Sequence, residues 1–362
     1  MAVITDKFFE LIQISLGNKN GFEQPPSERE WGTLFQLSCK HALAGILFEG
    51  FKKTKTKVQG KTQTLVFEWY ALQLQTIAAN KNQRERVKEL SILLANNGYR
   101  NCVLKGQGTA LYYDSSELRQ CGDIDIWVEG DRDDILSYAR NHGYKIPHID
   151  IKHSDIEFFE DVPVEVHFLP SWMYNPATNK RLQQFFDDQA EKQFGNYDVE
   201  AGFTHTTIEF DLVYSLVHIY RHIFSEGIGL RQLMDYYFIL LHSSIQQRVD
   251  ALKMLQNLKM LSFAGGIMWI LEHCFGMNDS MALCSVNKEH GQYLLSEILI
   301  AGNFGQYDPR TRRVAVQKRF ERGFVQLKKN FRFVCYYPSE VLWSPFWKLW
   351  HYVWRKRKGY LF

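Results

Sequence analysis

The chain has 362 residues, of which 45% are hydrophobic, 15% aromatic and 23% charged, and its net charge is +3. This length allows two or three packed units, and the composition excludes a disordered protein. The charge is unevenly placed: the segment 308–362 has 14 Lys and Arg residues against 3 Asp and Glu residues, which predicts an anionic partner for this tail.

No feature of the sequence indicates secretion or a membrane span. The first apolar stretch is interrupted by Asp6, Lys7 and Glu10, unlike the apolar part of a signal peptide. The apolar run 263–277 is too short to cross a bilayer and contains Glu272. The six cysteines are scattered without a C-x-x-C pair, as is typical of a reducing compartment. We therefore expect a cytoplasmic protein.

The first hundred residues are predicted to be helical, because apolar residues recur there at the spacing of an α-helix. The predicted helices cover 8–16, 34–46 and 64–96, and Gly98 is a stop signal after the third. We therefore expect an N-terminal helical region over 1–98.

The pattern changes after Gly98 to short strands and helices. The predicted strands cover 102–104, 123–128, 155–160 and 164–168. Helices are predicted over 109–113 and over 131–142, the second with Asp131 as its N-cap. This order of elements predicts a small α/β core over 99–202.

The rest of the chain is predicted to be helical again. Helices over 209–224 and 230–242 are followed by further helices to about residue 299 and by a loop over 302–305. We expect a C-terminal helical domain over 203–305 and then a basic, aromatic-rich tail over 306–362. The predicted fold class is α+β, with a small mixed sheet flanked by two helical regions.

Two aspartates separated by one residue carry the strongest chemical signal. Asp123 and Asp125 lie on one face of a strand, roughly 6–7 Å apart along the backbone, because side chains alternate along a strand. Glu165 lies on another predicted strand, and if the two strands are neighbours the three carboxylates meet on one face. Such carboxylates repel one another, and a pair of Mg²⁺ ions removes this repulsion. The alternative is an acidic pair on the solvent-facing side of an edge strand.

A glycine-containing turn joins the first predicted strand of the core to the helix after it. Lys105, Gly106, Gln107 and Gly108 form this turn. The free N–H groups at the start of a helix favour phosphate, and glycine allows the backbone to approach a ligand closely. The turn alone is a weak indication of nucleotide binding, and the nearby carboxylates strengthen it.

Together these motifs resemble the catalytic signature of the DNA polymerase β-like nucleotidyltransferase superfamily. The resemblance rests on Leu104-Lys105-Gly106, Arg119, Gly122-Asp123-Ile124-Asp125-Ile126 and Val164-Glu165-Val166-His167. More narrowly, the chain resembles a largely uncharacterised bacterial branch of this superfamily, because a helix like His218–His222 precedes a segment like 229–235. The likeness covers roughly 90–242, with a looser likeness over 337–354.

The resemblance implies a metal-dependent nucleotidyltransferase. Asp123, Asp125 and Glu165 are implied to be catalytic residues and ligands of Mg²⁺, or alternatively of Mn²⁺, with Glu165 on the acceptor side. An acceptor hydroxyl would attack the α-phosphate of a nucleoside triphosphate such as ATP, and pyrophosphate would leave. The acceptor is left open among a sugar phosphate, a small alcohol, a protein side chain and an RNA end.

Nucleotide contacts are expected from six residues: Lys105, Gly106, Gln107, Gly108, Arg119 and Arg231. Two departures from the superfamily pattern concern this binding. Gln107 stands where a serine is usual, and the gap from Gly106 to Asp123 is longer than usual. Lys105 is expected to supply positive charge to the phosphates instead.

Each of the two arginines has an alternative role. Arg119 precedes the strand of the aspartates and can equally be a solvated loop residue. Arg231 and Asp235 are four residues apart on a predicted helix, so they can form a helix salt bridge.

Three histidines are candidates for lining the substrate. His167 shares a strand face with Glu165 and can be a proton shuttle, a ligand or a core histidine. His218 and His222 are four apart on a helix and share a face, but no Glu follows the first as in a zinc H-E-x-x-H motif.

The tail combines tryptophans at helical spacing with a basic cluster. Ser344 is predicted to be an N-cap and Pro345 the first residue of a helix. One helical face is predicted to carry Trp343, Trp347, Trp350 and Trp354, and the cluster Arg355-Lys356-Arg357-Lys358 follows. The segment 343–358 can bind an anionic membrane surface, pack on the protein's own helices, or bind nucleic acid.

Two rival functions follow from these alternatives. One is a non-catalytic protein that binds nucleotides or a partner protein, and the other is a scaffold docked by the tail on the inner face of the membrane. The presence of all three carboxylates favours the enzyme, because a degenerate site does not require them.

Overall fold

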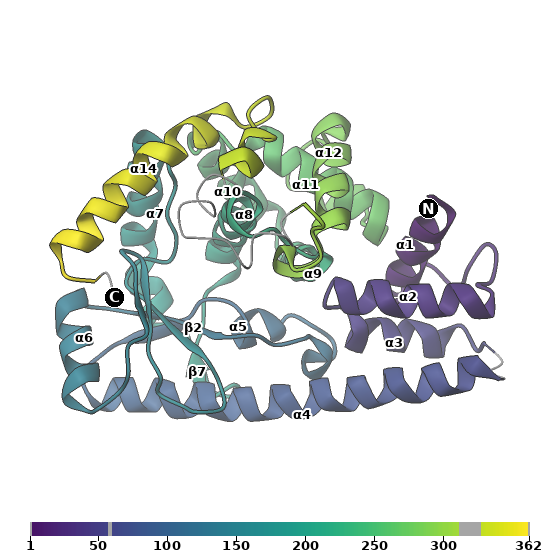
Figure 1. Cartoon of the computed structure of the whole chain (residues 1–362), viewed down its shortest axis with the longest axis horizontal. Coiled ribbons are helices and arrows are strands. Elements are labelled where there is room, and N and C mark those ends of the chain that lie inside the picture. Colours follow the sequence, from purple (N-terminus) through teal and green to yellow (C-terminus); the bar gives the residue numbers. More distant parts are fainter. Residues whose placement is uncertain (1, 57–59, 311–326, 361–362) are drawn as a thin grey trace.

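The computed structural model describes residues 2–56, 60–310 and 327–360 of the chain. It shows an α+β protein in which one small mixed sheet is surrounded by helices (Figure 1), as the sequence predicted. Residues 311–326 of the basic tail lie outside the described residues. The prediction of an anionic partner for the tail therefore rests partly on residues that the structure does not describe. Among helices built from described residues, none combines the length and apolar character needed to cross a bilayer.

Three N-terminal helices lie at one half of a very long helix. The three are α1 (Ala2–Leu16), α2 (Glu28–Lys40) and α3 (Ala44–Lys53), and the long helix is α4 (Lys61–Asn96). With 36 residues α4 is about 54 Å long, and Figure 1 shows it running beneath both the N-terminal helices and the sheet. The buried Trp69 donates to Ala44 O at 2.7 Å, whereas Leu90 and Leu94 pack against the sheet. One helix therefore connects the two regions.

The prediction of a single helix over 34–46 is wrong. The helix α2 ends at Lys40 and α3 begins at Ala44. Between them Ala42 adopts a left-handed φ of 57°, which is incompatible with a continuous right-handed helix.

The sheet has five strands in the order β1-β2-β5-β4-β3. Their bounds are β1 (Asn101–Val103), β2 (Ile124–Val128), β3 (His148–Ile149), β4 (His153–Asp155) and β5 (Val164–His167). The strands β2 and β5 are parallel and every other pair is antiparallel. The mixed sheet of the prediction is therefore present.

The strand predicted over 155–160 is wrong for most of its length. The strand β4 ends at Asp155, and the hydrogen bond from Ile156 N to Val164 O is followed by a turn. Phe158 N bonds to Ile156 O, two residues back, so the backbone is folded on itself rather than extended. On its other side β4 pairs with the short strand β3, which the sequence did not predict.

Opposite faces of the sheet pack against different helices. Ile124, Ile126 and Val128 face α4 and α6 (Arg132–Asn141), whose N-cap is Asp131 as predicted. On the other face Trp127 packs on Phe194 of α7 (Pro176–Phe194), with ring centroids 4.6 Å apart. Because side chains alternate along β2, Asp125 shares the face of Trp127. The carboxylates therefore face the C-terminal helices.

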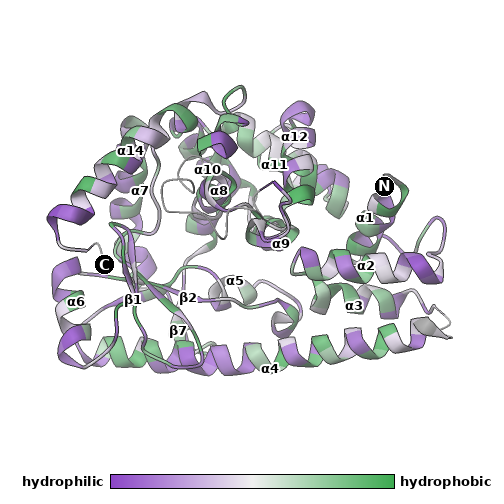
Figure 2. Cartoon of the chain, viewed as in Figure 1, coloured by the Kyte–Doolittle hydropathy of each residue, from purple (hydrophilic) through white to green (hydrophobic). Residues whose placement is uncertain are grey.

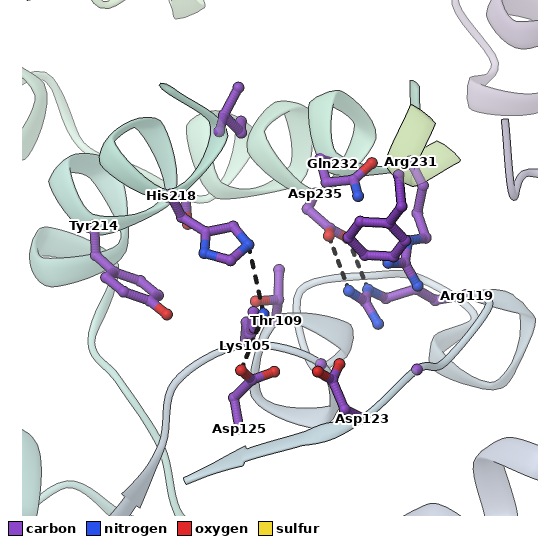
Figure 3. A pocket seen from close by; sticks show the side chains of 15 residues that line it. Lys105, Thr109, Arg119, Asp123, Asp125, Tyr214, His218, Arg231, Gln232 and Asp235 are labelled. Atoms are coloured by element: carbon purple, nitrogen blue, oxygen red, sulfur yellow. Dashed lines mark hydrogen bonds and ion pairs between the residues drawn. The ribbon is translucent and has the colours of Figure 1, made fainter. Parts of the chain in front are cut away.

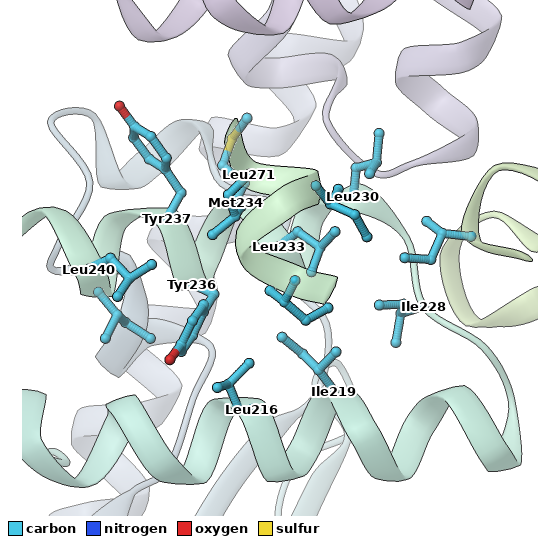
Figure 4. Packing of buried hydrophobic residues seen from close by; sticks show 14 of the residues in the cluster. Leu216, Ile219, Ile228, Leu230, Leu233, Met234, Tyr236, Tyr237, Leu240 and Leu271 are labelled. Carbon is cyan, nitrogen blue, oxygen red and sulfur yellow. The ribbon is translucent and has the colours of Figure 1, made fainter. Parts of the chain in front are cut away.

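The C-terminal helices form the largest part of the hydrophobic core. Their bounds are α8 (Ile208–Ser225), α9 (Leu230–Leu241), α10 (Ile245–Asn257), α11 (Leu261–Phe275) and α12 (Lys288–Ala301). Figure 4 shows Leu216 and Ile219 of α8 facing Leu233 and Tyr236 of α9. Asn18, just after α1, donates from Nδ2 to Phe275 O at 2.7 Å. This bond and the packing of α1 on α11 join the N-terminal helices to this core.

Short elements complete the described fold. They are α5 (Gln107–Ala110), η1 (Ser116–Leu118), β6 (Tyr197–Asp198), β7 (Phe203–Thr204), η2 (Asp279–Met281) and η3 (Asn303–Gly305). The helix predicted over 109–113 is thus shorter and begins earlier, and the loop predicted over 302–305 is a single 3₁₀ turn.

The tail helix begins seven residues before the predicted start. The helix α14 (Pro338–Arg357) has Pro338 at its first position and contains Pro345 in its interior, so the predicted N-cap at Ser344 is wrong. The buried Glu340 fixes the first turn, because its carboxylate accepts hydrogen bonds from the backbone N of Tyr174 and Asn175. Figure 2 shows hydrophobic and hydrophilic residues alternating along this helix.

A buried carboxyl group in α8 is expected to make stability depend on pH. Burial raises the pKa of Asp211 to about 7, although a hydrogen bond from Tyr112 opposes the shift. The folded protein therefore holds a proton that the unfolded chain loses near pH 4. This contribution to stability is complete below pH 4 and is lost as the pH rises through about 7.

Asp211→Asn mimics the protonated side chain and should remove this dependence. Between pH 5 and 7 the wild type should lose up to about 1.4 kcal/mol of unfolding free energy per pH unit through this group, whereas the variant should not. The stability of the variant relative to wild type should therefore increase with pH. Urea denaturation at pH 5, 6, 7 and 8 measures this difference. A difference that stays constant over the series contradicts a raised pKa for Asp211.

Candidate active site

The three predicted carboxylates come together on the sheet. The parallel pairing of β2 and β5 places Asp125 directly opposite Glu165, and Asp123 immediately precedes β2. Oxygen atoms of Asp123, Asp125 and Glu165 all lie within 4.8 Å of one another. Asp125 is buried, whereas the side chain of Glu165 is 30% exposed. The arrangement is not the solvent-facing side of an edge strand, because β2 has a neighbour on each side.

Two basic side chains neutralise this group. Lys105 Nζ lies 3.0 Å from Asp125 Oδ1 and 3.5 Å from His218 Nε2 (Figure 3). On the other side, His167 Nε2 lies 2.9 Å from the same Asp125 oxygen and 3.5 Å from Glu165 Oε2. Burial alone would lower the pKa of both bases, but the adjacent carboxylates outweigh burial and raise both pKa values.

The two aspartates differ in their affinity for a proton. Burial disfavours the charged form of Asp125, but Lys105 and the hydrogen bond from His167 outweigh it and lower the pKa of Asp125. The negative charge of Asp125 in turn raises the pKa of Asp123, and burial adds to this rise. The group therefore keeps a charged inner carboxylate and a neighbour that is easily protonated when no further cation is bound.

The donor set fits divalent cations with oxygen ligands. Mg²⁺ and Mn²⁺ prefer carboxylates, and two such ions about 3.5–4 Å apart can be bridged by shared carboxylates. Asp125 Oδ2 is buried and has no hydrogen-bond partner among the described residues, which is costly for a carboxylate oxygen. An ion bound by Asp125 would remove this cost.

The glycine turn lies beside the first aspartate. Gly106 has a φ of 62°, and a Cβ built on it would lie 3.7 Å from Asp123 O. The positive φ favours glycine at this position. A Cβ on Gly108 would lie 3.3 Å from both His205 Cβ and Val103 O, so Gly108 permits close packing of the turn on the sheet.

The side chain of Gln107 points away from the carboxylates. Its Nε2 donates to Asn80 Oδ1 and to Gln83 Oε1, both at 2.9 Å, so it ties the turn to α4. A contact of Gln107 with nucleotide is therefore confined to its backbone. This long-range role has no local signal in the sequence.

The two arginines lie at a small cavity of about 40 Å³ that Lys105, Gly106 and Asp123 also line (Figure 3). Arg119 is buried and binds both carboxylate oxygens of Asp235, at 2.7 and 2.9 Å. It is therefore not a solvated loop residue, and Asp235 pairs with Arg119 rather than with Arg231.

Arg231 has a freer guanidinium group than Arg119. Its Nη1 donates to Gln120 O at 2.6 Å, whereas its buried Nε has no partner among the described residues. Of the two arginines, Arg231 thus keeps more hydrogen-bonding capacity for a phosphate in the cavity.

A larger cleft of about 860 Å³ adjoins the small cavity, with which it shares Lys105, Asp123 and His218. All three candidate histidines line it: His167, His218 and His222. The rings of His218 and His222 lie 4.3 Å apart, and burial lowers the pKa values of both, so both are neutral at pH 7. Neutral imidazoles can donate or accept hydrogen bonds to a polar substrate.

Several lining residues were not found from the sequence. The small cavity is also lined by Thr109, Tyr214, Gln232 and Phe304, and the cleft by His148, Asp150, Lys152, His153, Tyr174, Arg221 and Trp347. The spacing of His148, Asp150 and His153 was a signal that could have been noticed. The others lie on helices or in short turns, where the local sequence indicates only burial or a change of direction.

A mixed sheet, three converging carboxylates and an adjoining glycine turn are the features of a nucleotidyltransferase. The model of a protein family described as uncharacterised nucleotidyltransferase matches residues 27–276, and the chain belongs to this family. The match begins before α2 and ends after α11, so it is wider than the 90–242 expected from the motifs, and 337–354 lies outside it. No curated protein matches the chain.

Proposed function

We propose that this protein transfers a nucleoside monophosphate from a nucleoside triphosphate to an acceptor hydroxyl, and that pyrophosphate leaves. The observation that carries the proposal is the convergence of Asp123, Asp125 and Glu165 between a small basic cavity and a large polar cleft. We assign the basic residues at the cavity, which at about 40 Å³ is too small for a whole triphosphate, to one terminal phosphate, and the adjoining cleft of about 860 Å³ to the rest of the nucleotide and to the acceptor. Mg²⁺, or Mn²⁺, would be held by the three carboxylates and would polarise the α-phosphate and the attacking hydroxyl.

The basic residues at the cavity have distinct tasks in this proposal. The oxygen of the acceptor forms a bond to the α-phosphorus, and the bond from this phosphorus to the bridging oxygen breaks. Lys105 and Arg231 stabilise the negative charge that accumulates on the leaving pyrophosphate. Arg119 acts through Asp235, because their bidentate pair fixes the segment that leads into β2.

The residues on the cleft side prepare the acceptor. Glu165 faces the cleft and accepts the proton of the attacking hydroxyl. His167 orients Asp125 and Glu165, since its Nε2 contacts both. Lys152 and Arg221 also line the cleft and can bind an anionic group of the acceptor, such as that of a sugar phosphate. A protein side chain or an RNA end remains an outcome of the experiment.

Incubation with two differently labelled triphosphates tests the reaction type. Each NTP is supplied with the label on the α- or on the γ-phosphate, together with Mg²⁺ or Mn²⁺ and cell extract. Nucleotidyl transfer places only the α-label on an acceptor and releases the γ-label as pyrophosphate. Transfer of the γ-label to an acceptor contradicts the proposal, because it indicates a kinase.

The non-catalytic alternative predicts binding without product. Thermal denaturation with and without Mg²⁺-NTP measures binding, because a ligand of the native state raises the melting temperature. A clear rise with no labelled product for any NTP would favour a nucleotide-binding protein. No rise and no product would exclude both functions for this site.

A second candidate function is docking on an anionic membrane surface. Trp347 and Trp354 pack inward on the protein, but one side of α14 leaves large apolar residues exposed: Leu342, Trp343, Phe346, Leu349, Trp350 and Val353. The exposed basic residues Lys356 and Arg357 end the same helix, and the exposed Lys358 follows it. Exposed aromatic residues beside basic ones suit the interface of an anionic bilayer. We propose that α14 places the enzyme peripherally on such a surface.

Liposome flotation tests this docking without deleting α14, which also contributes to the core. We expect wild-type protein to float with vesicles of anionic phospholipid, and Trp343→Ser/Phe346→Ser/Leu349→Ser to reduce the floating fraction severalfold, because apolar burial drives insertion. The control Phe67→Ser/Tyr70→Ser removes two exposed aromatic residues from α4. Equal flotation of all three proteins, or none with wild type, excludes docking by α14.

A further inference from the structure

One face of the sheet is covered by residues that can bind metal ions. Pairing across the strands aligns His148, Asp155, Glu165 and Asp125 in one row. The next row contains His153 and His167, which are paired, and Asp150 N bonds to His153 O beside them. Directly paired residues point to the same face, so the proposed catalytic carboxylates occupy only one end of this surface.

At the other end, three residues of the β3–β4 hairpin form a second group, which adjoins the carboxylates because His153 also lies within 4.8 Å of Glu165 and His167. Ligand atoms of His148, Asp150 and His153 all lie within 4.8 Å of one another. Ligands of a tetrahedral zinc ion with bonds of about 2.0–2.1 Å lie roughly 3.3 Å apart, so small rotations of these side chains suffice. All three residues line the 860 Å³ cleft.

A second observation indicates a ligand at this group. The buried Nδ1 of His153 has no hydrogen-bond partner among the described residues, and it lies 4.0 Å from Glu165 Oε2, beyond hydrogen-bond distance. A buried imidazole nitrogen without a partner is costly, and a metal ion satisfies it.

A residue of the tail helix supports the same group from outside. His351 Nε2 lies 3.1 Å from Asp150 Oδ1, and the His351 ring is stacked between Trp347 and Trp354. Metal-binding carboxylates are commonly held by such an outer partner, which fixes their orientation. His351 Nε2 has no hydrogen-bond partner among the described residues, so we infer a positioning role of His351 for Asp150 from their proximity alone.

We propose that His148, Asp150 and His153 bind one transition-metal ion of the zinc type, separate from the ions assigned to the three carboxylates. Two imidazoles and one carboxylate select Zn²⁺ and similar ions over Mg²⁺, which prefers oxygen ligands. Three protein ligands leave a fourth position for water or substrate, as in zinc sites that take part in catalysis. The ion would thus bind oxygen atoms of a substrate that occupies the cleft.

Metal analysis of the full chain tests this site independently of any transferase activity. The protein is stripped with chelator, titrated with Zn²⁺ against a chromophoric chelator, and checked for folding by circular dichroism. We expect about one tight Zn²⁺ per chain, retained in Asp123→Ala/Asp125→Ala. Affinity should fall more than tenfold in His148→Ala and Asp150→Ala, and roughly 10–100-fold in His351→Ala. The control His142→Ala, an exposed histidine on the same domain, should bind as wild type.

Cobalt spectroscopy gives a second measurement that does not depend on variants. Co²⁺ in a four-coordinate site with nitrogen ligands gives intense visible bands, and Co²⁺ in an octahedral oxygen site gives weak ones. Weak bands with wild-type protein overturn the proposal. It is equally overturned if Zn²⁺ binding is lost in Asp123→Ala/Asp125→Ala but kept in His148→Ala, because the ion then belongs to the carboxylates.

Discussion

Replacing Asp123 and Asp125 by alanine is expected to reduce transfer of the α-label more than roughly a hundredfold. Loss of even an outer partner of a metal ligand costs about 10–100-fold, and this variant removes two proposed ligands. Both side chains belong to the group of three that lies within 4.8 Å, so the variant keeps Glu165 as the single carboxylate of that group. The measurement is the rate of acceptor labelling at saturating Mg²⁺ and NTP.

A matched control separates this effect from a general loss of charge. Asp187→Ala/Asp188→Ala also removes two aspartates, but both are exposed on α7 and away from the cleft. This variant should label the acceptor at the wild-type rate. Equal labelling by wild type and by Asp123→Ala/Asp125→Ala would show that the assignment of the metal ligands is wrong.

The second large effect is expected from Lys105→Met, which removes the ammonium group beside Asp125. The side chain of Lys105 is 20% exposed and that of Asp125 only 1%. Breaking this pair leaves the buried carboxylate with only His167 of its two basic neighbours. We therefore expect a cost at the lower end of the usual range, about 3 kcal/mol of unfolding free energy. Urea denaturation of the metal-free protein measures this loss.

Divalent metal should reverse much of the loss. A bound ion supplies the positive charge that the variant lacks, so Mg²⁺ should stabilise Lys105→Met more than it stabilises wild type. The control Lys145→Met breaks a surface pair in which the lysine is 83% exposed, and it should cost less than about 1 kcal/mol with no dependence on Mg²⁺. If Mg²⁺ stabilises Lys105→Met and wild type equally, Lys105 does not compensate the metal-binding carboxylates.

The parts of the fold that were predicted from sequence depend on local patterns. Alternation along 123–128 and 164–168 predicted both strands of the carboxylates, and the Asp131 cap predicted the start of α6. The sequence predicted that Asp123, Asp125 and Glu165 converge only if their two strands are neighbours in the sheet. The parallel pairing of β2 and β5 meets that condition.

The parts that were missed depend on contacts between distant segments. Arg119 and Asp235 are 116 residues apart, and nothing near either residue specifies the other as its partner. Gln107 bonds to Asn80 of α4 across 27 residues, and Glu340 of α14 bonds to the backbone at Tyr174 across 166 residues. A buried polar residue must find such partners, but sequence reveals only that it is polar. The same reason explains the wrong prediction of Ser344 as an N-cap. Ser344-Pro345 fits the local pattern of a helix start, but the start of α14 is fixed by the hydrogen bonds of Glu340 to the distant backbone at Tyr174 and Asn175.

The long helix α4 has a mechanical consequence for the whole molecule. It is held by the N-terminal helices at one end and by the sheet at the other, while α1 packs on α11 and the Arg119–Asp235 pair joins the sheet to α9. These attachments close a ring of rigid bodies, and a closed ring resists the hinge opening by which many two-lobed enzymes admit their substrates. Substrates should therefore enter between walls that stay in place, and exchange of ligands should depend on side-chain rotation at the cleft rather than on movement of whole lobes.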